Sequence, residues 1–311
     1  MTTRQRGAAP GGARAERRGI GAEAPTLALL ALCYGAWGLG TWLGGAWLPL
    51  GIALTTLAVA LFSSLQHEAI HGHPTRWPAL NAALVFPALT LVVPYLRFRD
   101  THLDHHYDAD LTDPYDDPES NYLDPAVWAR LPRALRVLLV FNNTLLGRMT
   151  VGTAIGLAAF LAGDLRQARA GDTRVLRGWL WHLPALAPVA LWLAVAPMPV
   201  WAYALSVYMA MSLVRIRTFL EHQAAARVSG RTAIIEDRGP LAWLFLNNNL
   251  HVVHHMHPRV PWYRLPRLYA ANRARYAGRN GGYVYGSYAQ VFRRYFLRPK
   301  DPVAHPLRPG R

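Results

Sequence analysis

The sequence predicts an all-α integral membrane protein in which four transmembrane helices form two hairpins, with interfacial helices beside them. Three observations predict this fold class. The chain is rich in apolar residues, it contains apolar runs long enough to cross a bilayer, and very short turns join those runs in pairs. Of its 311 residues, 52% are hydrophobic and only 16% are charged, whereas an average soluble protein has about 25% charged residues. A deficit of that size indicates surface that faces lipid.

The first expected hairpin lies near the N-terminus. Its helices cover about residues 26–43 and 47–65, and each approaches the roughly 20 apolar residues that a span requires. A short turn that begins with two glycines joins them, so the two helices must run antiparallel.

The second expected hairpin lies in the C-terminal half. Its helices cover about residues 178–195 and 200–214, and a Pro-Met-Pro turn at 197–199 joins them. Two further apolar stretches, about 80–96 and 135–161, are interrupted by prolines or by asparagine and arginine. We expect these two stretches to be re-entrant or interfacial.

The basic residues predict the orientation of the chain and its class of partner. The formal net charge is +15, and Lys300 is the only lysine, so arginine carries nearly all of the positive charge. Long apolar runs between the arginines favour an anionic membrane over nucleic acid as the partner. Two hairpins return the chain to its starting side, and the positive-inside rule then predicts that both termini are cytoplasmic.

The same pattern divides the chain into three parts. We expect a disordered basic tail at residues 1–25, a membrane domain at 26–270 and a basic cytoplasmic tail at 271–311. The single cysteine, Cys33, excludes a disulfide framework and a cysteine-ligated iron–sulfur cluster.

Eight histidines occur in three clusters. Residues three and four positions apart lie on one face of a helix, so each cluster forms a one-sided array of imidazoles. Imidazoles packed this densely would repel one another if charged and would leave polar atoms unpaired if neutral, and bound metal removes both difficulties. Eight ligands exceed the four of one zinc ion, which implies two metal ions, and imidazole suits zinc, copper, iron or nickel. The clusters are His67-Glu-Ala-Ile-His71, His102-Leu-Asp-His105-His106 and His251-Val-Val-His254-His255.

Two other classes of protein are alternatives. The first cluster fits H-E-x-x-H, the helix motif of zinc metalloproteases, in which Glu68 would act as the general base. Such a protease needs only one further ligand and leaves the other two clusters unexplained. A membrane carrier of metal or haem is the second alternative. Axial haem ligands usually face each other within spans, whereas these clusters lie at the ends of apolar runs.

In their order and spacing, the clusters resemble the three histidine boxes of the membrane fatty acid desaturase superfamily, which also includes carotenoid, alkane and sterol hydroxylases. The boxes read HEAIH, HLDHH and HVVHH, and the extended third motif at 248–258 looks like that of bacterial members. The resemblance covers about residues 26–265. It implies a four-span helical domain in the bacterial inner membrane, with two irons at the cytoplasmic face.

The resemblance also implies a set of ligands. Members usually have one more histidine ligand just after the fourth span, and His222 stands at that position. Glu68 is then expected to orient a histidine, whereas His73 and His257 lie outside the boxes and are not expected to bind iron. The implied iron ligands are His67, His71, His102, His105, His106, His222, His251, His254 and His255.

The implied activity is oxygen-dependent desaturation of a fatty acyl lipid or acyl thioester. Hydroxylation of a lipid, alkane or carotenoid on the same scaffold is the alternative, because the two outcomes differ only in fine placement of the substrate. The chain has no His-Pro-Gly-Gly haem motif, so electrons are expected from a separate ferredoxin, rubredoxin or reductase. The acidic stretch 104–119 is expected to be a solvated loop that balances nearby arginines, and we assign no role to His182 or His305.

Overall fold

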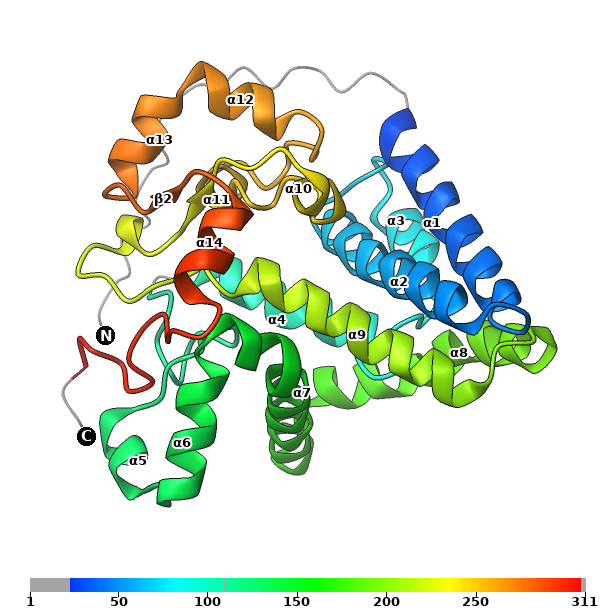
Figure 1. The fold of residues 1–311 in the computed structure, drawn as a ribbon, viewed down its shortest axis with the longest axis horizontal. Coiled ribbons are helices and arrows are strands. Elements are labelled where there is room, and N and C mark those ends of the chain that lie inside the picture. Colours follow the sequence, from blue (N-terminus) through cyan, green and yellow to red (C-terminus); the bar gives the residue numbers. More distant parts are fainter. Residues whose placement is uncertain (1–22, 109, 309–311) are drawn as a thin grey trace, which may run out of the picture.

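A computed structural model of the chain describes residues 23–108 and 110–308, which are mostly helical (Figure 1). The all-α fold class predicted by the sequence is confirmed. The longer helices are α1 (Ala24–Leu43), α2 (Leu48–Ile70), α4 (Tyr95–Tyr107), α7 (Leu145–Arg169), α8 (Thr173–Val195) and α9 (Val200–Thr218). The shorter helices are α3 (Pro78–Leu84), α5 (Pro125–Arg130), α6 (Arg133–Asn142), the 3-10 helix η1 (Val228–Gly230), α10 (Pro240–Leu244), α11 (His251–Met256), α12 (Leu265–Ala271), α13 (Arg273–Arg279) and α14 (Tyr288–Tyr295).

Helices α1 and α2 form the first expected hairpin. Glycines let the two helices touch: a β-carbon on Gly51 would lie 2.5 Å from the Cα atom of Gly44, and one on Gly40 would lie 2.6 Å from the hydroxyl of Thr55. The buried face of α2, which includes Phe62, forms the centre of the largest apolar core. The hairpin is therefore set by small residues at its turn and by apolar burial along α2.

Helices α8 and α9 form the second expected hairpin. The turn between them packs on the first turn, because a β-carbon on Gly44 would lie 2.6 Å from Cε of Met198 and one on Gly45 would lie 2.4 Å from Cβ of Pro197. Tyr203 of α9 is fully buried, and its hydroxyl donates to the loop between α3 and α4. The two hairpin turns consequently meet at one end of the molecule, and the free ends of α2 and α9 lie at the other.

Within residues 23–108 and 110–308, four helices are long and apolar enough to cross a membrane, namely α1, α2, α7 and α8. The sequence predicts this number, but it assigns the fourth span to residues 200–214 and not to α7. Helix α7 is continuous over 25 residues, and the side chain of Arg148 in its first turn folds back and donates to the carbonyl of Asn142. Helix α9 is not one of the four, and it carries Arg215 and Arg217 at its C-terminal end.

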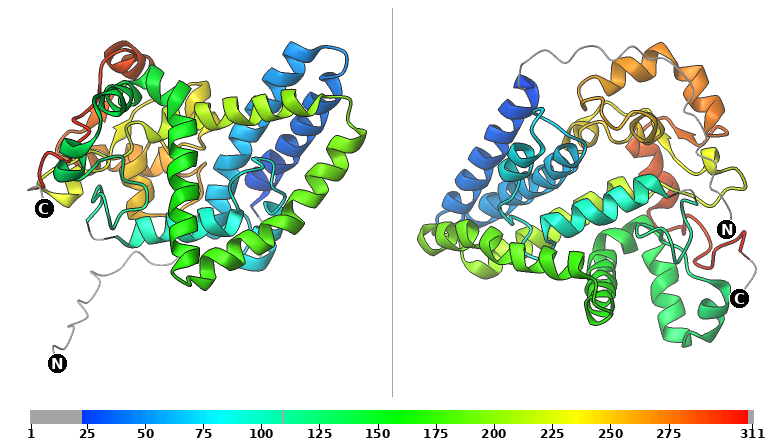
Figure 2. Two further views of the ribbon diagram at one scale, coloured as in Figure 1. Left: turned by 90° about the horizontal axis from the view of Figure 1, so that it is seen from below. Right: turned by 180° about the vertical axis from the view of Figure 1, so that it is seen from behind.

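Helix α7 crosses α9 and ends beside α4 and α8 (Figure 2). Its first residue, Leu145, packs in an apolar cluster with Phe219, just beyond the end of α9. Near its other end, Asp164 forms a buried ion pair with Arg97 of α4 at 2.8 Å and accepts a hydrogen bond from Trp179 of α8. Both ends of α7 therefore contact elements at the end of the molecule opposite the hairpin turns.

The residues after α9 fold over the free ends of the hairpins (Figure 1). Strands β1 (Ile234–Ile235) and β2 (Val284–Tyr285) pair in parallel, and the side chains of Tyr285, Tyr288 and Tyr295 are buried. The sequence assigns 271–311 to a cytoplasmic tail, yet residues 273–308 form α13, β2, α14 and a packed terminal segment, because these aromatic rings supply an apolar face. The predicted N-terminal tail lies almost wholly outside the described residues.

Candidate metal centre

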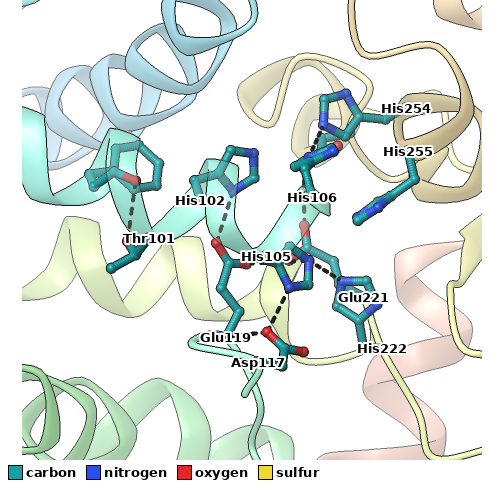
Figure 3. A network of polar contacts seen from close by, with 12 residues as sticks. Thr101, His102, His105, His106, Asp117, Glu119, Glu221, His222, His254 and His255 are labelled. Atoms are coloured by element: carbon teal, nitrogen blue, oxygen red, sulfur yellow. Dashed lines mark hydrogen bonds and ion pairs between the residues drawn. The ribbon is translucent and has the colours of Figure 1, made fainter. Parts of the chain in front are cut away.

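The three histidine boxes and His222 converge at the end of the helical core opposite the hairpin turns. Figure 3 shows histidines of the second and third boxes together with His222. The first box occupies the C-terminal end of α2, the second box lies in α4, and the third box forms α11. His222 follows α9, where its backbone pairs with Thr232 in an isolated antiparallel bridge. Four elements that are distant in sequence thus supply imidazoles to one place.

Five imidazoles form what we call the first group. One nitrogen from each ring lies within 4.8 Å of the corresponding nitrogen of every other ring. Nε2 of His71 is 3.0 Å from Nε2 of His102, and Nε2 of His254 is 3.1 Å from Nε2 of His106. Nε2 of His67 is buried and has no hydrogen-bond partner among the described residues. The five nitrogens therefore lie close enough together to share one metal ion.

Four imidazoles form the second group, again with their nitrogens within 4.8 Å of one another. Nε2 of His222 is 3.0 Å from Nε2 of His105 and 3.1 Å from Nε2 of His251, and Nε2 of His255 is 3.1 Å from Nε2 of His251. The groups adjoin, since the rings of His255 and His106 stack at 4.2 Å. All nine histidines singled out in the sequence thus lie in one of the two groups.

Two carboxylates determine which nitrogen of the second box points into the groups. Glu119 Oε1 lies 2.8 Å from Nδ1 of His102, and Asp117 Oδ1 lies 2.7 Å from Nδ1 of His105. Both belong to the acidic stretch 104–119. The expectation that this stretch is a solvated loop is wrong for these two residues, because their contacts with the imidazoles draw the loop inward.

An amide fixes the third box in a similar way. The side-chain oxygen of Asn248 lies 3.1 Å from Nδ1 of His251, and the amide nitrogen of Asn248 donates to Glu221 at 3.1 Å. Glu221 in turn forms an ion pair with Arg217 at 3.0 Å. This chain of contacts ties the third box to the end of α9.

The surroundings of most of these rings favour the neutral imidazole. Burial, followed by repulsion from neighbouring imidazoles, lowers the pKa of His255 well below its ordinary value and that of His106 to about 3. His105 differs: burial lowers its pKa, but Glu119 and Asp117 outweigh burial and raise the pKa to about 9. The same carboxylates would stabilise a metal cation at this position.

These donors fit metal ions. An imidazole whose Nδ1–H donates to a carboxylate presents a lone pair at Nε2. His102 meets this condition, and His105 meets it when a metal cation displaces the proton that its raised pKa retains. Each of the two has the Nε2 atom of another histidine at 3.0 Å. Two lone pairs at that distance repel unless a proton or a metal cation lies between them. Groups of five and four nitrogens suit two metal ions better than one.

Glu68 belongs to neither nitrogen group. Its carboxylate accepts a hydrogen bond at 3.2 Å from the backbone N–H of Trp262, which follows the third box. No hydrogen bond joins Glu68 to a histidine side chain among the described residues, so it does not orient an imidazole directly as the sequence suggests. Its contact with the Trp262 backbone also differs from the role of the general base in a zinc metalloprotease.

The remaining histidines lie outside both groups. None of these four histidines belongs to a box, and each has a contact outside the two groups. The contacts are His73 with Glu23, His182 with the carbonyl of Leu91, His257 with the ring of Tyr276, and His305 with the hydroxyl of Thr112.

Sequence reasoning missed Asp117, Glu119 and Asn248 as residues that orient the histidines. The available signal was the concentration of six acidic residues at 108–119, directly after the second box. That signal marks the segment, but it does not distinguish the two inward carboxylates from the other four.

Comparisons with known proteins agree with the geometry. The family model described as "Fatty acid desaturase" matches residues 41–287, a range that includes all nine histidines of the two groups. A beta-carotene ketolase from Paracoccus sp. (strain N81106 / MBIC 01143) is 28% identical over 224 residues, which cover 69% of this chain and 76% of the ketolase. The chain therefore belongs to the fatty acid desaturase family and is an integral membrane oxidoreductase of the desaturase and hydroxylase type.

Proposed function

We propose that the protein is a diiron enzyme that uses dioxygen to desaturate fatty acyl chains. The observation that carries the proposal is the pair of imidazole groups, five and four nitrogens, at the end of an apolar helical core. Imidazole alone does not choose among iron, zinc, copper and nickel, and membership of the family favours iron. The proposed iron ligands are His67, His71, His102, His105, His106, His222, His251, His254 and His255.

The residues of the chain would bind the metal ions and orient the ligands, and the apolar core would shield the site from water. Bound iron, with dioxygen and two electrons, supplies an oxidant strong enough to break an unactivated C–H bond. Desaturation takes two hydrogens from adjacent carbons, and with two further protons and two electrons the dioxygen becomes two waters. Glu119 and Asp117 hold His102 and His105 in the tautomer that presents Nε2 inward, so these ligands are oriented before a substrate arrives.

Oxygen insertion into a carotenoid-like chain is the second candidate. The similarity to a beta-carotene ketolase favours it. Insertion places one oxygen atom in the product and reduces the other to water, whereas desaturation places none there. The fate of the oxygen atoms therefore distinguishes the two candidates.

The proposed electron donor is a separate ferredoxin, rubredoxin or reductase. The single cysteine of the chain, Cys33, is buried in α1, which leaves no cysteine set for an iron–sulfur cluster of its own. We place the histidine end on the cytoplasmic side of a bacterial inner membrane. Arg215 and Arg217 lie near that end of α9, in keeping with the positive-inside rule.

The test is expression of the chain in a bacterial host under ¹⁸O₂, followed by mass spectrometry of the acyl lipids. The expected result is a new double bond without ¹⁸O in the product, abolished by His105→Ala and retained by His257→Ala, which changes a histidine outside both groups. Incorporation of ¹⁸O into β-carotene in a carotenoid-producing host would support the second candidate. Oxygen-independent activity that requires zinc would overturn both.

A further inference from the structure

We infer that the C-terminal strap, residues 298–305, positions His222 in the second group and that Lys300 is the residue that holds it. The inference rests on the proposed function, because it requires His222 to be a metal ligand. The strap follows α14 and runs beside the end of the acidic loop (Figure 1).

His222 needs support from outside its own segment. Helix α9 ends at Thr218, so His222 lies in a loop. Its Nδ1 atom is buried and has no hydrogen-bond partner among the described residues, whereas Glu119 and Asp117 hold the Nδ1 atoms of His102 and His105. Without a side-chain contact at Nδ1, the position of the His222 ring depends on how firmly its backbone is held.

Lys300 holds that backbone. Its ammonium group donates to the carbonyl of His222 and forms an ion pair with Asp301 at 3.2 Å, and its side chain is only 9% exposed. Lys300 is also the only lysine among 33 basic residues. A compact ammonium can serve one buried carbonyl and one carboxylate, whereas the wider guanidinium of arginine would bring five N–H donors that also need partners.

A second contact holds the backbone two residues further on. The hydroxyl of Tyr122 donates to Asp301 at 2.6 Å and accepts a hydrogen bond from the backbone N–H of Ala224 at 2.9 Å. The carbonyl of His222 and the N–H of Ala224 are thus both held by the same Lys300–Asp301 pair, one directly and one through Tyr122. This arrangement fixes the chain on both sides of Gln223.

The strap is itself anchored to two neighbouring segments. The backbone N–H of Lys300 donates to the carbonyl of Asn143 at 2.9 Å. Leu123 donates to Val303 at 2.8 Å, and His305 donates back to Leu123 at 2.8 Å. Because Leu123 follows the acidic loop, the strap connects His222 to the segment whose carboxylates orient the second box.

The experiment is a zinc titration of metal-free, full-length protein in detergent, with stoichiometry measured by native mass spectrometry. We expect the wild-type protein to bind two ions. In Lys300→Met, the affinity for one ion should fall by about 10–100-fold, as when a residue that orients a ligand is lost, and the affinity for the other should be unchanged. His222→Ala should lose the same ion, Lys300→Arg should restore part of the affinity, and Arg298→Met, which removes an exposed cation of the same strap, should match the wild type.

The inference would be overturned if Lys300→Met bound both zinc ions with the wild-type affinities. It would also be overturned if the variant lost both ions while keeping the helical content of the wild type. If Lys300→Met fails to fold, Tyr122→Phe decides, because it removes one hydroxyl and should weaken the same single ion. A wild-type protein that binds fewer than two ions would overturn the proposed function and this inference with it. A wild-type protein that binds two ions, with Lys300→Met binding both at the wild-type affinities, would overturn the inference alone.

Discussion

At the residue scale, the candidate centre depends on groups behind the histidines as much as on the histidines. Asp117 illustrates this, because its carboxylate also accepts backbone N–H groups from Thr112 at 2.8 Å and from Glu119 at 2.9 Å. Its position is therefore fixed by its own loop. A buried carboxylate held in this way favours one tautomer and one orientation of the His105 ring.

The change Asp117→Asn tests that role. The amide keeps the size of the side chain but loses the charge and one acceptor oxygen, so we expect metal affinity to fall by about 10–100-fold and turnover to fall with it. Asp116→Asn is the matched control, because Asp116 is the exposed neighbour. Metal titration and product analysis measure both variants, and equal effects would contradict the assignment.

Glu68 permits a second test at this scale. In Glu68→Gln, an amide oxygen remains to accept the Trp262 N–H, so we expect activity to be lowered only in part. His105→Ala removes a proposed ligand and should abolish activity. Both are measured as product formed per unit of membrane protein. The reverse pattern, complete loss with Glu68→Gln and retention with His105→Ala, would favour a protease with Glu68 as its base.

At the scale of elements, one buried ion pair connects α4 to α7. The side chains of Arg97 and Asp164 are 4% and 5% exposed, and Asp164 also accepts from Trp179 of α8. Gly178 makes room for this contact, because a β-carbon there would lie 2.8 Å from Cδ of Arg97. Helix α4, which carries the second box, thus depends on α7 and α8 for its position.

Replacement of Asp164 by alanine should therefore destabilise the fold. Loss of Asp164 leaves the Arg97 guanidinium buried without a counter-charge, with only a hydrogen bond of 3.4 Å to Gln167, which costs about 3–5 kcal/mol. Asp104→Ala is the control, because the side chain of Asp104 is 58% exposed and its distance to Arg174 is 3.9 Å; its effect should be far smaller. Unfolding in detergent measures both, and similar midpoints would contradict a structural role for the buried pair.

At the scale of the whole molecule, the two hairpin turns meet at one end and the histidines gather at the other. Because both ends of α7 lie away from the turns, α9 has to return the chain from the second turn to the histidine end. This polarity predicts that the turns at 44–46 and 197–199 share one side of the membrane, with both termini on the opposite, cytoplasmic side. Reporter fusions in the 44–46 turn and after Arg311 should report opposite sides, and a fusion in the second turn should match the first. The same side for the first turn and for Arg311 would refute the arrangement.

The sequence by itself determined the features that depend on local pattern. The length of the apolar runs determines that α1, α2 and α8 are long apolar helices, and Gly44 and Gly45 determine a tight turn between the first two. Spacing along a helix places the members of each histidine box on one face, because the helical repeat is fixed by backbone hydrogen bonds. These inferences need no knowledge of what each helix packs against.

Only the tertiary structure decided which distant groups meet. Six acidic residues closely follow the second box, at 108–119, yet only the folded loop distinguishes Asp117 and Glu119, which contact imidazoles. Likewise, Lys300 reads as part of a basic tail until the strap brings it to the carbonyl of His222. Such pairings depend on packing between segments that are far apart in the chain, and the periodicity of a single segment carries no information about its partner.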